Sequence, residues 1–338
     1  MGAPRSRHRR TPHHHLLLPQ DHTRRVLPPQ PNPLVRPMTI TSTQQHPGAR
    51  LRSLMQTKCI GLPGAFNALV ARAVADAGFE GMYVSGAAVT TSCGVPDIGL
   101  LTLNEFTHII RQVTQAADLP TIADADTGFG EAETLIRTVW EYHRAGAAGL
   151  HIEDQVFPKR CGHLDDKALI PTDAFADKVH RAAQARDACS NGDFIICART
   201  DAAGVEGLDS AIDRARAYLD AGADMIFPEG LHSLDDFKRV ADALKSHKPD
   251  AFLLANMTEF GKTPIIPLAD FAAAGYSCVI WPVTTLRTAM GAVTRMLRNL
   301  HATGSVAADL DDMQPRSELY RLLGYTPGRE WHYPNPRS

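Results

Sequence analysis

The pentapeptide KRCGH at residues 159–163 holds the most reactive combination of side chains in this 338-residue sequence. A thiol between cations and close to an imidazole has its thiolate favoured, which lowers the pKa of Cys161. Lys159, Arg160 and His163 are the groups that would tune it. The alternative is an ordinary surface loop with a spare cysteine. We predict a reactive thiol on an exposed loop.

Four carboxylates form a second candidate group. Asp124 and Asp126 lie two residues apart, so in an extended segment their side chains point the same way. Glu153 follows the next apolar run, and Asp97 lies in an earlier loop. Oxygen ligands without His or Cys suit Mg²⁺ or Mn²⁺, which keep several waters and bind substrate oxygens. The alternative is a carboxylate pair for acid–base chemistry without a metal.

Arginines accompany these carboxylates. Arg199 and Arg287 follow apolar runs, and Arg316 lies near the C-terminus. Arginine binds carboxylates through two parallel hydrogen bonds, so several arginines beside a metal indicate a polyanionic substrate. We expect a di- or tricarboxylate, or a phosphonate.

The elements that must position these residues are eight short apolar runs separated by amphipathic helical stretches. The predicted strands are residues 58–62, 82–85, 120–124, 148–153, 194–199, 224–228, 252–256 and 278–282. Eight strands alternating with helices over about 250 residues are typical of a (β/α)8 TIM-type barrel. A doubly wound sheet would need a Gly-rich phosphate turn after its first strand, which the sequence lacks. Polar residues follow nearly every predicted strand, where barrel enzymes carry their active groups.

Composition divides the chain into a leader and a body. Residues 1–38 hold seven Arg and one Asp, about +6, whereas the whole chain has a net charge of −2. We predict a disordered, basic, Pro/His-rich leader over 1–44 and one barrel domain with a C-terminal helical extension over 45–338. Met38 opens a more ordinary start than Met1. The near-neutral charge and the lack of a long apolar run predict no nucleic-acid or membrane partner.

Cysteine usage predicts a reducing, cytoplasmic environment. The six cysteines contain no CxxC pair, which argues against a disulfide framework and a zinc site. We expect all of them except Cys161 to be small buried apolar residues. The other five are Cys59, Cys93, Cys189, Cys197 and Cys278.

These motifs resemble those of the isocitrate lyase / phosphoenolpyruvate mutase superfamily, from about Pro47 to Trp331. KRCGH is the most specific, because the superfamily's mutases lack that cysteine. The other motifs are YVSGAAV (83–89), PDIG (96–99), DADTGFG (124–130), HIEDQ (151–155), ARTDA (198–202), FPEG (227–230), the stretch ending TEFGKTP (258–264) and MQPRSELY (313–320).

The resemblance implies an activity and roles for residues. It implies Mg²⁺-dependent retro-aldol cleavage of 2-methylisocitrate to pyruvate and succinate, in the methylcitrate route of propionate breakdown. Asp124 and Asp126 would hold the metal, with Asp97 and Glu153 close by, and Cys161 would be the catalytic acid. The substrate would be bound by Ser85, Gly86, Ala87, Arg199, Glu229, Asn256, Thr258, Arg287 and Arg316. The base stays open between Tyr83, a carboxylate and a metal-bound hydroxide. A homotetramer with a helix exchanged between paired subunits is also implied.

Substrate choice is predicted from apolar residues. Phe227, Ile280 and Pro282 would form an apolar nook for a substrate methyl group. We therefore expect 2-methylisocitrate to be preferred over isocitrate, although one methyl contributes only about 1–3 kcal/mol. An oxaloacetate hydrolase or decarboxylase of the same superfamily is the other alternative.

Overall fold

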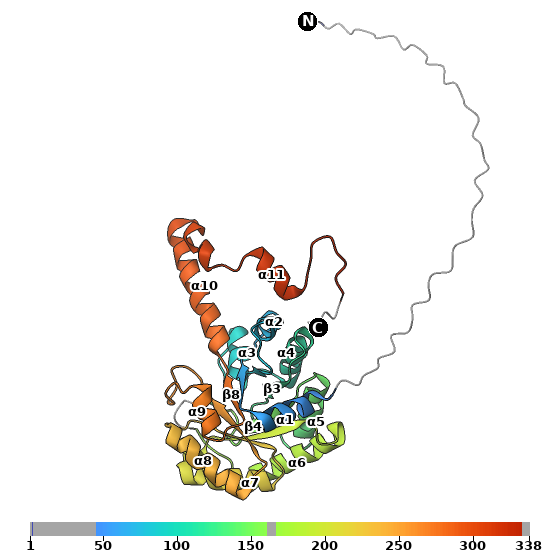
Figure 1. The fold of residues 1–338 in the computed structure, drawn as a ribbon, viewed down its shortest axis with the longest axis vertical. Coiled ribbons are helices and arrows are strands. Elements are labelled where there is room, and N and C mark those ends of the chain that lie inside the picture. Colours follow the sequence, from blue (N-terminus) through green and yellow to red (C-terminus); the bar gives the residue numbers. More distant parts are fainter. Residues whose placement is uncertain (1, 3–44, 161–166, 333–338) are drawn as a thin grey trace, which may run out of the picture. The chain divides into compact units, whose positions relative to one another are not determined.

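The structure, a computed structural model, describes residue 2 and residues 45–160 and 167–332 of the chain (Figure 1). Cys161 and His163, predicted to be catalytic, therefore lie outside the described residues. So do almost all of residues 1–44, where the predicted leader and Met38 lie.

Eight parallel strands form a barrel, which confirms the predicted fold class. The strands are β1 (Ile60–Pro63), β2 (Met82–Val84), β3 (Thr121–Asp124), β4 (Gly149–Glu153), β5 (Ile195–Thr200), β6 (Met225–Pro228), β7 (Phe252–Asn256) and β8 (Cys278–Trp281). Their order is β1-β8-β7-β6-β5-β4-β3-β2. An isolated parallel bridge between Gly64 and Tyr83 joins the end of β1 to β2. Each strand lies within two residues of its predicted position.

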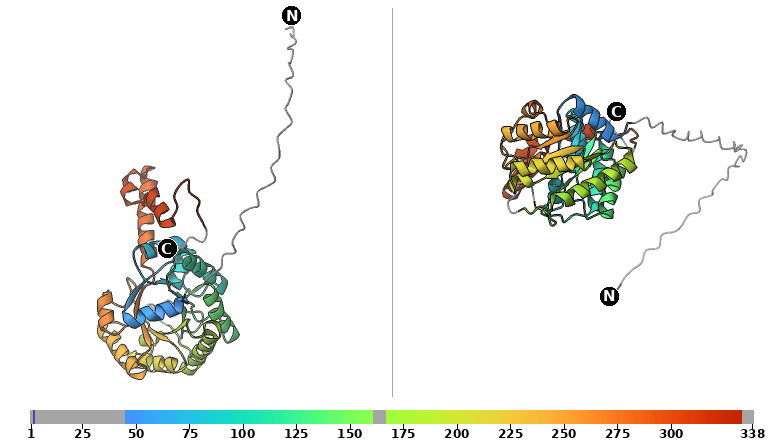
Figure 2. Two further views of the ribbon diagram at one scale, coloured as in Figure 1. Left: turned by 45° about the vertical axis from the view of Figure 1, so that its right-hand side comes forward. Right: turned by 90° about the horizontal axis from the view of Figure 1, so that it is seen from below.

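Helices alternate with the strands and surround them (Figure 2). They are α1 (Pro47–Thr57), α2 (Ala68–Asp76), α3 (Gly86–Ser92), α4 (Leu103–Ala116), α5 (Glu133–Arg144), α6 (Thr172–Ser190), α7 (Leu208–Asp220), α8 (Leu234–His247), α9 (Leu268–Ala273), α10 (Thr284–Thr303) and α11 (Arg316–Leu323), with short 3-10 helices η1 (Ala202–Gly204) and η2 (Ala307–Asp312). Capping boxes begin α4 at Thr102 and α8 at Ser233. These satisfy backbone N–H groups that would otherwise lack partners.

Alternation along the strands divides the core into two parts. Leu62, Ile122 and Leu254 belong to one buried cluster, which also includes Leu51 and Met55 of α1. The residues between them on the strands pack against the outer helices in a second cluster. Successive strand side chains point to opposite faces, so the first cluster fills the barrel interior. Helix α1, which the sequence reading did not predict, contributes to that interior.

The C-terminal extension contains α10, η2 and α11. Helix α10 leaves the barrel directly after β8 and points away from it (Figure 1). Leu286 is its one buried residue. Helix α11 packs on α2, where Arg321 forms an ion pair with Asp76 and Arg72 donates to the Leu322 carbonyl. Among the described residues, no helix is both long and apolar enough to span a membrane.

The prediction that five cysteines are buried is wrong for Cys93. Cys197 and Cys278 are fully buried in the barrel interior, and Cys59 and Cys189 are partly buried. Cys93 is exposed at the C-terminal end of α3. Its neighbours Thr91 and Ser92 are polar, and only tertiary packing decides which side of so short a helix faces solvent.

Candidate active site

A cavity of about 80 Å³ opens at the carboxyl ends of the strands. Most predicted site residues line it together. They are Tyr83, Ser85, Ala87, Asp97, Asp124, Arg199, Glu229, Asn256, Thr258 and Arg287. Phe227, Ile280 and Pro282, the predicted apolar nook, line the same cavity, with Val283 beside them. The strand ends therefore place charged and apolar groups around one small space.

Lys159 lies between two of the predicted metal carboxylates. Its ammonium Nζ is 2.5 Å from Asp97 Oδ1 and 2.8 Å from Asp126 Oδ1, and its side chain is only 2% exposed. Burial opposes its charge, but the surrounding carboxylates outweigh burial and raise the pKa of Lys159 well above its usual range. This residue of the KRCGH segment thus enters the site as a fixed cation.

Asp124 is held by the backbone around it. Its Oδ2 accepts a hydrogen bond from Gly86 N–H at 3.0 Å, and its Oδ1 accepts one from Asp126 N–H at 3.0 Å. Burial alone would raise the pKa of Asp124, but His151, Lys159 and Arg199 lower it below its ordinary value. A methyl group on Gly86 would lie 2.6 Å from Asp124 Oδ2, so this approach requires glycine. Gly86 N–H, predicted to bind substrate, is used here by Asp124.

Asp126 and Glu153 carry buried oxygens that form no well-aligned hydrogen bond among the described residues. These are Asp126 Oδ1 and both carboxylate oxygens of Glu153. Burial raises the pKa of Asp126 to about 6 and that of Glu153 well above its ordinary value. Buried polar atoms without partners cost free energy unless a ligand satisfies them. Asp126 Oδ1 already faces Lys159 at 2.8 Å, and Glu153 Oε2 already faces Arg199 at 3.2 Å. Of these three oxygens, Glu153 Oε1 alone has neither a hydrogen bond nor an ion pair among the described residues.

The donor set fits a hard cation that keeps part of its water shell. Among the described residues, no group of three or more Asp, Glu, His or Cys side chains is clustered as a ready-made metal site. Mg²⁺, however, is commonly held by one or two carboxylates, with waters and substrate oxygens completing its coordination. Asp124 and Asp126 supply those carboxylates, and the oxygens of Glu153 remain for water-mediated contacts.

His151 is a site residue that the sequence analysis missed. Its Nε2 lies 2.6 Å from the Tyr83 hydroxyl and 3.6 Å from Asp124 Oδ1. Burial lowers the pKa of His151 to about 4, so it is neutral at physiological pH. Burial and Asp124 raise the pKa of Tyr83 well above its ordinary value, which keeps it a phenol. The motif HIEDQ could have indicated this role for His151. Residues two apart on a strand face the same side, and Glu153 was already a predicted site residue.

Arg199 is clamped by a second residue that the analysis missed, Asp201. The Arg199 Nε and Nη2 atoms donate to the two carboxylate oxygens of Asp201 at 3.0 and 3.1 Å. Glu153 Oε2 lies 3.2 Å from Nη1, and Glu229 Oε2 lies 3.7 Å from Nη2. The guanidinium also stacks over Phe227 at 5.1 Å from the ring centroid. These contacts fix Arg199 while it lines the cavity.

The opposite wall is formed by β7 and the start of α10. Asn256 donates through Nδ2 to Glu229 Oε2 at 3.0 Å. Arg287 Nη1 lies 3.4 Å from Thr258 Oγ1 and 3.0 Å from Glu259 Oε2. The Arg287 side chain is 44% exposed, unlike that of Arg199 at 9%. Arg287 thus stands at the rim, and Arg199 lies deeper.

The remaining predicted residues differ in position. Ser85 caps α3, accepting from Ala88 N–H at 3.3 Å. The Arg160 backbone is held by the side chain of Gln155, with its N–H donating to Oε1 and its carbonyl accepting from Nε2, both at 2.9 Å. Arg316 is exposed at the start of α11 and does not line the cavity.

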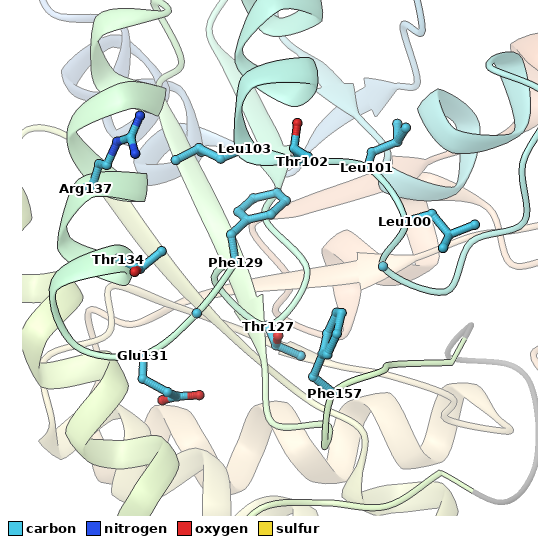
Figure 3. A pocket seen from close by; sticks show the side chains of 12 residues that line it. Leu100, Leu101, Thr102, Leu103, Thr127, Phe129, Glu131, Thr134, Arg137 and Phe157 are labelled. Carbon is cyan, nitrogen blue, oxygen red and sulfur yellow. The ribbon is translucent and has the colours of Figure 1, made fainter.

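A second cavity of about 510 Å³ lies between the loops that precede α4 and α5 (Figure 3). It is mostly apolar, with Leu100, Phe129 and Phe157 on its walls and Arg137 at one edge. Asp97 lies in the loop before α4, and Lys159 lies two residues after Phe157 in the loop that follows β4. The larger cavity nevertheless shares no lining residue with the smaller one.

The fold and this site define an enzyme of the (β/α)8 barrel class with a small polar cavity at the carboxyl ends of its strands. The family model described as phosphoenolpyruvate phosphomutase matches residues 51–301. A Corynebacterium glutamicum protein described as probable 2-methylisocitrate lyase 1 is 54% identical over 78% of this chain and 84% of its own. The chain belongs to the phosphoenolpyruvate mutase/isocitrate lyase superfamily.

Two solved structures support this membership. The crystal structure of 2,3-dimethylmalate lyase superposes with a TM-score of 0.76 at 35% identity, over 83% of this chain and 92% of the other. Oxaloacetate acetylhydrolase with the inhibitor 3,3-difluorooxalacetate gives a TM-score of 0.76 at 33% identity, over 82% and 93%.

Proposed function

We propose that this chain is a carbon–carbon lyase that cleaves 2-methylisocitrate into pyruvate and succinate. The 54% identity to a protein described as a probable 2-methylisocitrate lyase supports this substrate. The observation that carries the proposal is the composition of the smaller cavity. It joins Arg199 and Arg287, which attract carboxylates, to the apolar Phe227, Ile280 and Pro282.

That combination matches the substrate chemically. A tricarboxylate needs cationic donors, and arginine provides paired N–H groups for each carboxylate. A substrate methyl needs an apolar contact, which polar walls would not offer. We assign the methyl group to the apolar nook and the carboxylates to Arg199, Arg287 and their neighbours. The hydroxyl of Ser85 and the backbone around Ala87 line the same space and are assigned to a substrate carboxylate.

Lyases of this superfamily depend on a metal ion, and we propose Mg²⁺, with Mn²⁺ as a substitute. Asp124 and Asp126 would hold it, with Asp97 and Glu153 acting directly or through water. When bound, the ion would lower the pKa of the substrate hydroxyl and neutralise an adjacent carboxylate. The burial of the Asp126 and Glu153 carboxylates, together with Glu153 Oε1, which has no hydrogen bond or ion pair among the described residues, supports this assignment.

The chain's own groups handle the protons. In cleavage the substrate hydroxyl gives its proton to a base, and the electrons of the broken C–C bond pass to the succinate fragment. Arg199 and Asn256 would stabilise the resulting carbanion by hydrogen bonds to its carboxylate. That carbanion needs a proton, and we assign its delivery to Cys161. Lys159, buried between Asp97 and Asp126, fixes the chain two residues before this thiol. The phenol of Tyr83, paired with His151 at 2.6 Å, orients the substrate hydroxyl.

Assays for the products of each reaction test the proposal. These products are pyruvate from 2-methylisocitrate or from decarboxylated oxaloacetate, glyoxylate from isocitrate, and acetate with oxalate from hydrolysed oxaloacetate. Purified protein is given 2-methylisocitrate, isocitrate or oxaloacetate, each with Mg²⁺ and with EDTA. We expect pyruvate from 2-methylisocitrate, loss of the reaction with EDTA and a lower kcat/KM for isocitrate. Turnover of oxaloacetate alone would instead make the chain a hydrolase or decarboxylase.

The thiol separates lyase from hydrolase chemistry. Cys161→Ser removes the assigned acid and should abolish cleavage, because a hydroxyl is a far weaker acid than a thiol. Cys93→Ser, an exposed cysteine outside the cavity, is the matched control and should keep full activity. Near-normal turnover by Cys161→Ser would contradict the assignment.

We also propose a cytoplasmic homotetramer in which paired subunits exchange a helix. Helix α10 supports this proposal, since it buries only Leu286 and exposes Met290 (49%) and Leu297 (52%). Apolar side chains in such a row are typical of a surface that packs against another chain. In this assembly Arg316 would complete the site of a neighbouring subunit.

A further inference from the structure

Three carboxyl groups surround the Arg199 guanidinium. Asp201, Glu153 and Glu229 all place a carboxylate oxygen within 3.7 Å of its nitrogens. A cation surrounded in this way has little net attraction left for an anionic substrate. A further positive charge is needed if Arg199 is to bind a carboxylate.

Lys167 supplies that charge from the far side of Asp201. Its ammonium Nζ lies 2.7 Å from Asp201 Oδ1, the oxygen that also accepts from Arg199 Nη2 at 3.1 Å. The two side chains are 4% and 0% exposed. The Asp201 carboxylate is thus shared between a cation that lines the cavity and one that does not.

Hydrogen bonds fix the backbone that carries the shared carboxylate. Asp201 N–H donates to Asp154 Oδ1 at 3.0 Å, and Asp154 Oδ2 accepts from Thr200 and Tyr218, both at 2.8 Å. The carboxylate itself contacts Arg199 and Lys167, so the orientation of Asp201 and that of Arg199 are set together.

Lys167 is held by the backbone of its own segment. Val156 N–H donates to the Ala168 carbonyl at 2.7 Å, and Ile170 N–H donates to the Asp154 carbonyl at 2.9 Å. Gln155 and Leu169 form an antiparallel bridge between these contacts. Burying a lysine costs several kcal/mol, so an ion pair of this kind adds little to stability. Its charge therefore calls for an explanation beyond folding.

We propose that Lys167 and Asp201 form a positioning pair for substrate binding. Asp201 orients the Arg199 guanidinium, and Lys167 offsets the Asp201 charge so that Arg199 keeps its attraction for a substrate carboxylate. Neither residue touches the substrate. The inference rests on the proposed function for its choice of substrate, but not for its anion-binding role.

The experiment compares Lys167→Met, Lys167→Arg and the control Lys178→Met. Lys178 is likewise buried and ion-paired, with Glu131 at 3.0 Å, but it lies outside the cavity. We measure KM and kcat for 2-methylisocitrate, the Kd of succinate with Mg²⁺ by calorimetry, and the thermal midpoint.

Lys167→Met should raise KM and the succinate Kd about tenfold and change kcat less than about threefold, because only binding is weakened. Lys167→Arg should return both values to within about threefold of wild type, since it restores the charge. Lys178→Met should leave both unchanged. Wild-type KM and Kd in Lys167→Met would overturn the proposal. So would a result in which Lys167→Met lowers only the thermal midpoint, and by the same amount as Lys178→Met.

A failure of the proposed function can be distinguished from a failure of the Lys167–Asp201 inference. If the wild-type protein releases no pyruvate from 2-methylisocitrate, that substrate is wrong. The succinate titration then still decides whether Lys167 supports anion binding: a Kd raised in Lys167→Met supports the pair, and an unchanged Kd overturns it.

Discussion

The mouth of the barrel and the α10 helix differ in what each leaves unsatisfied. At the mouth, charged side chains are buried, and Glu153 Oε1 has neither a hydrogen bond nor an ion pair among the described residues. On α10, apolar side chains such as Leu297 stay exposed. Buried polar atoms call for a polar ligand, whereas exposed apolar surface calls for another apolar surface.

The two regions also differ in how tightly they hold their residues. Each ionic group at the mouth has fixed partners, as Lys159 has in Asp97 and Asp126. Such preorganised charges can act on a substrate without rearranging first. Helix α10 has one buried residue, and its contacts with the barrel lie in its first turn, where Thr285 donates to the Gly64 carbonyl at 2.7 Å and Arg287 contacts Glu259. Chemistry should therefore respond to single substitutions at the mouth, and assembly to substitutions on α10.

The largest effect is expected from Asp124→Asn. It removes a carboxylate assigned to Mg²⁺ and should lower kcat at least about a hundredfold, because loss of a ligand exceeds loss of an outer-shell partner. Initial rates of pyruvate release over a range of Mg²⁺ concentrations measure this. Asp118→Asn, at a surface ion pair with Arg50, is the control and should stay near wild type. Full activity of Asp124→Asn at low Mg²⁺ would remove it from the metal site.

Glycine substitutions compare the two regions directly. Gly86→Ala would place a methyl 2.6 Å from Asp124 Oδ2, so we expect a loss of about 1–3 kcal/mol in stability and reduced turnover. At Gly291 in α10 the nearest atom to a new methyl is Arg295 Nη1 at 3.6 Å. Gly291→Ala should stabilise by about 0.5–1 kcal/mol through helix propensity. Urea unfolding and kcat measure both, and equal tolerance at the two sites would refute the difference.

Leu297→Glu tests assembly. A charge on the exposed apolar side of α10 should shift the protein to smaller species, because an apolar interface does not accept an unpaired carboxylate. Light scattering coupled to gel filtration gives the mass. Arg298→Glu, at the adjacent exposed position, controls for the added negative charge. Unchanged mass in Leu297→Glu would place the subunit contacts elsewhere.

The smallest effect concerns thiol reactivity at pH 8. Burial raises the pKa of Cys59 to about 11, above its ordinary value of 9.0, so its thiolate is scarce at that pH. Exposed Cys93 should react with iodoacetamide first among the described cysteines, as followed by peptide mass spectrometry. Urea-unfolded protein should show similar rates at all sites. Rapid labelling of fully buried Cys197 in folded protein would contradict the packing of the barrel interior.

Local patterns were sufficient to predict most of the fold and many members of the site. The apolar runs located all eight strands, because a strand buried on both faces needs several consecutive apolar residues. The polar residues after those runs meet at one end, because parallel strands in a barrel share that end. Helix α1 was not predicted, because the apolar Leu51 and Met55, which enter the barrel interior, lie among polar residues and form only a weak pattern in the sequence.

Partners distant in sequence could not be predicted. Tyr83 and His151 are 68 residues apart, and Lys167 and Asp201 are 34 apart. Neither pair is visible before folding, because Tyr83 on β2 meets His151 on β4 across β3. Lys167 reaches Asp201 from the loop before α6. For Arg316 the sequence motif predicted a site residue that the structure does not place in the site. Arg316 is exposed on α11 and does not line the cavity of its own chain.

The sequence by itself therefore determined the barrel, the chemical types in its mouth and the superfamily, because periodicity and strand-end residues are local properties. Only the tertiary structure decided which charged side chains form ion pairs with one another. Closing the barrel brought Lys159 to Asp97, 62 residues away, and left Asp201 shared between Arg199 and Lys167. Ion pairing depends on distances of a few ångströms between side chains, and packing alone sets those distances.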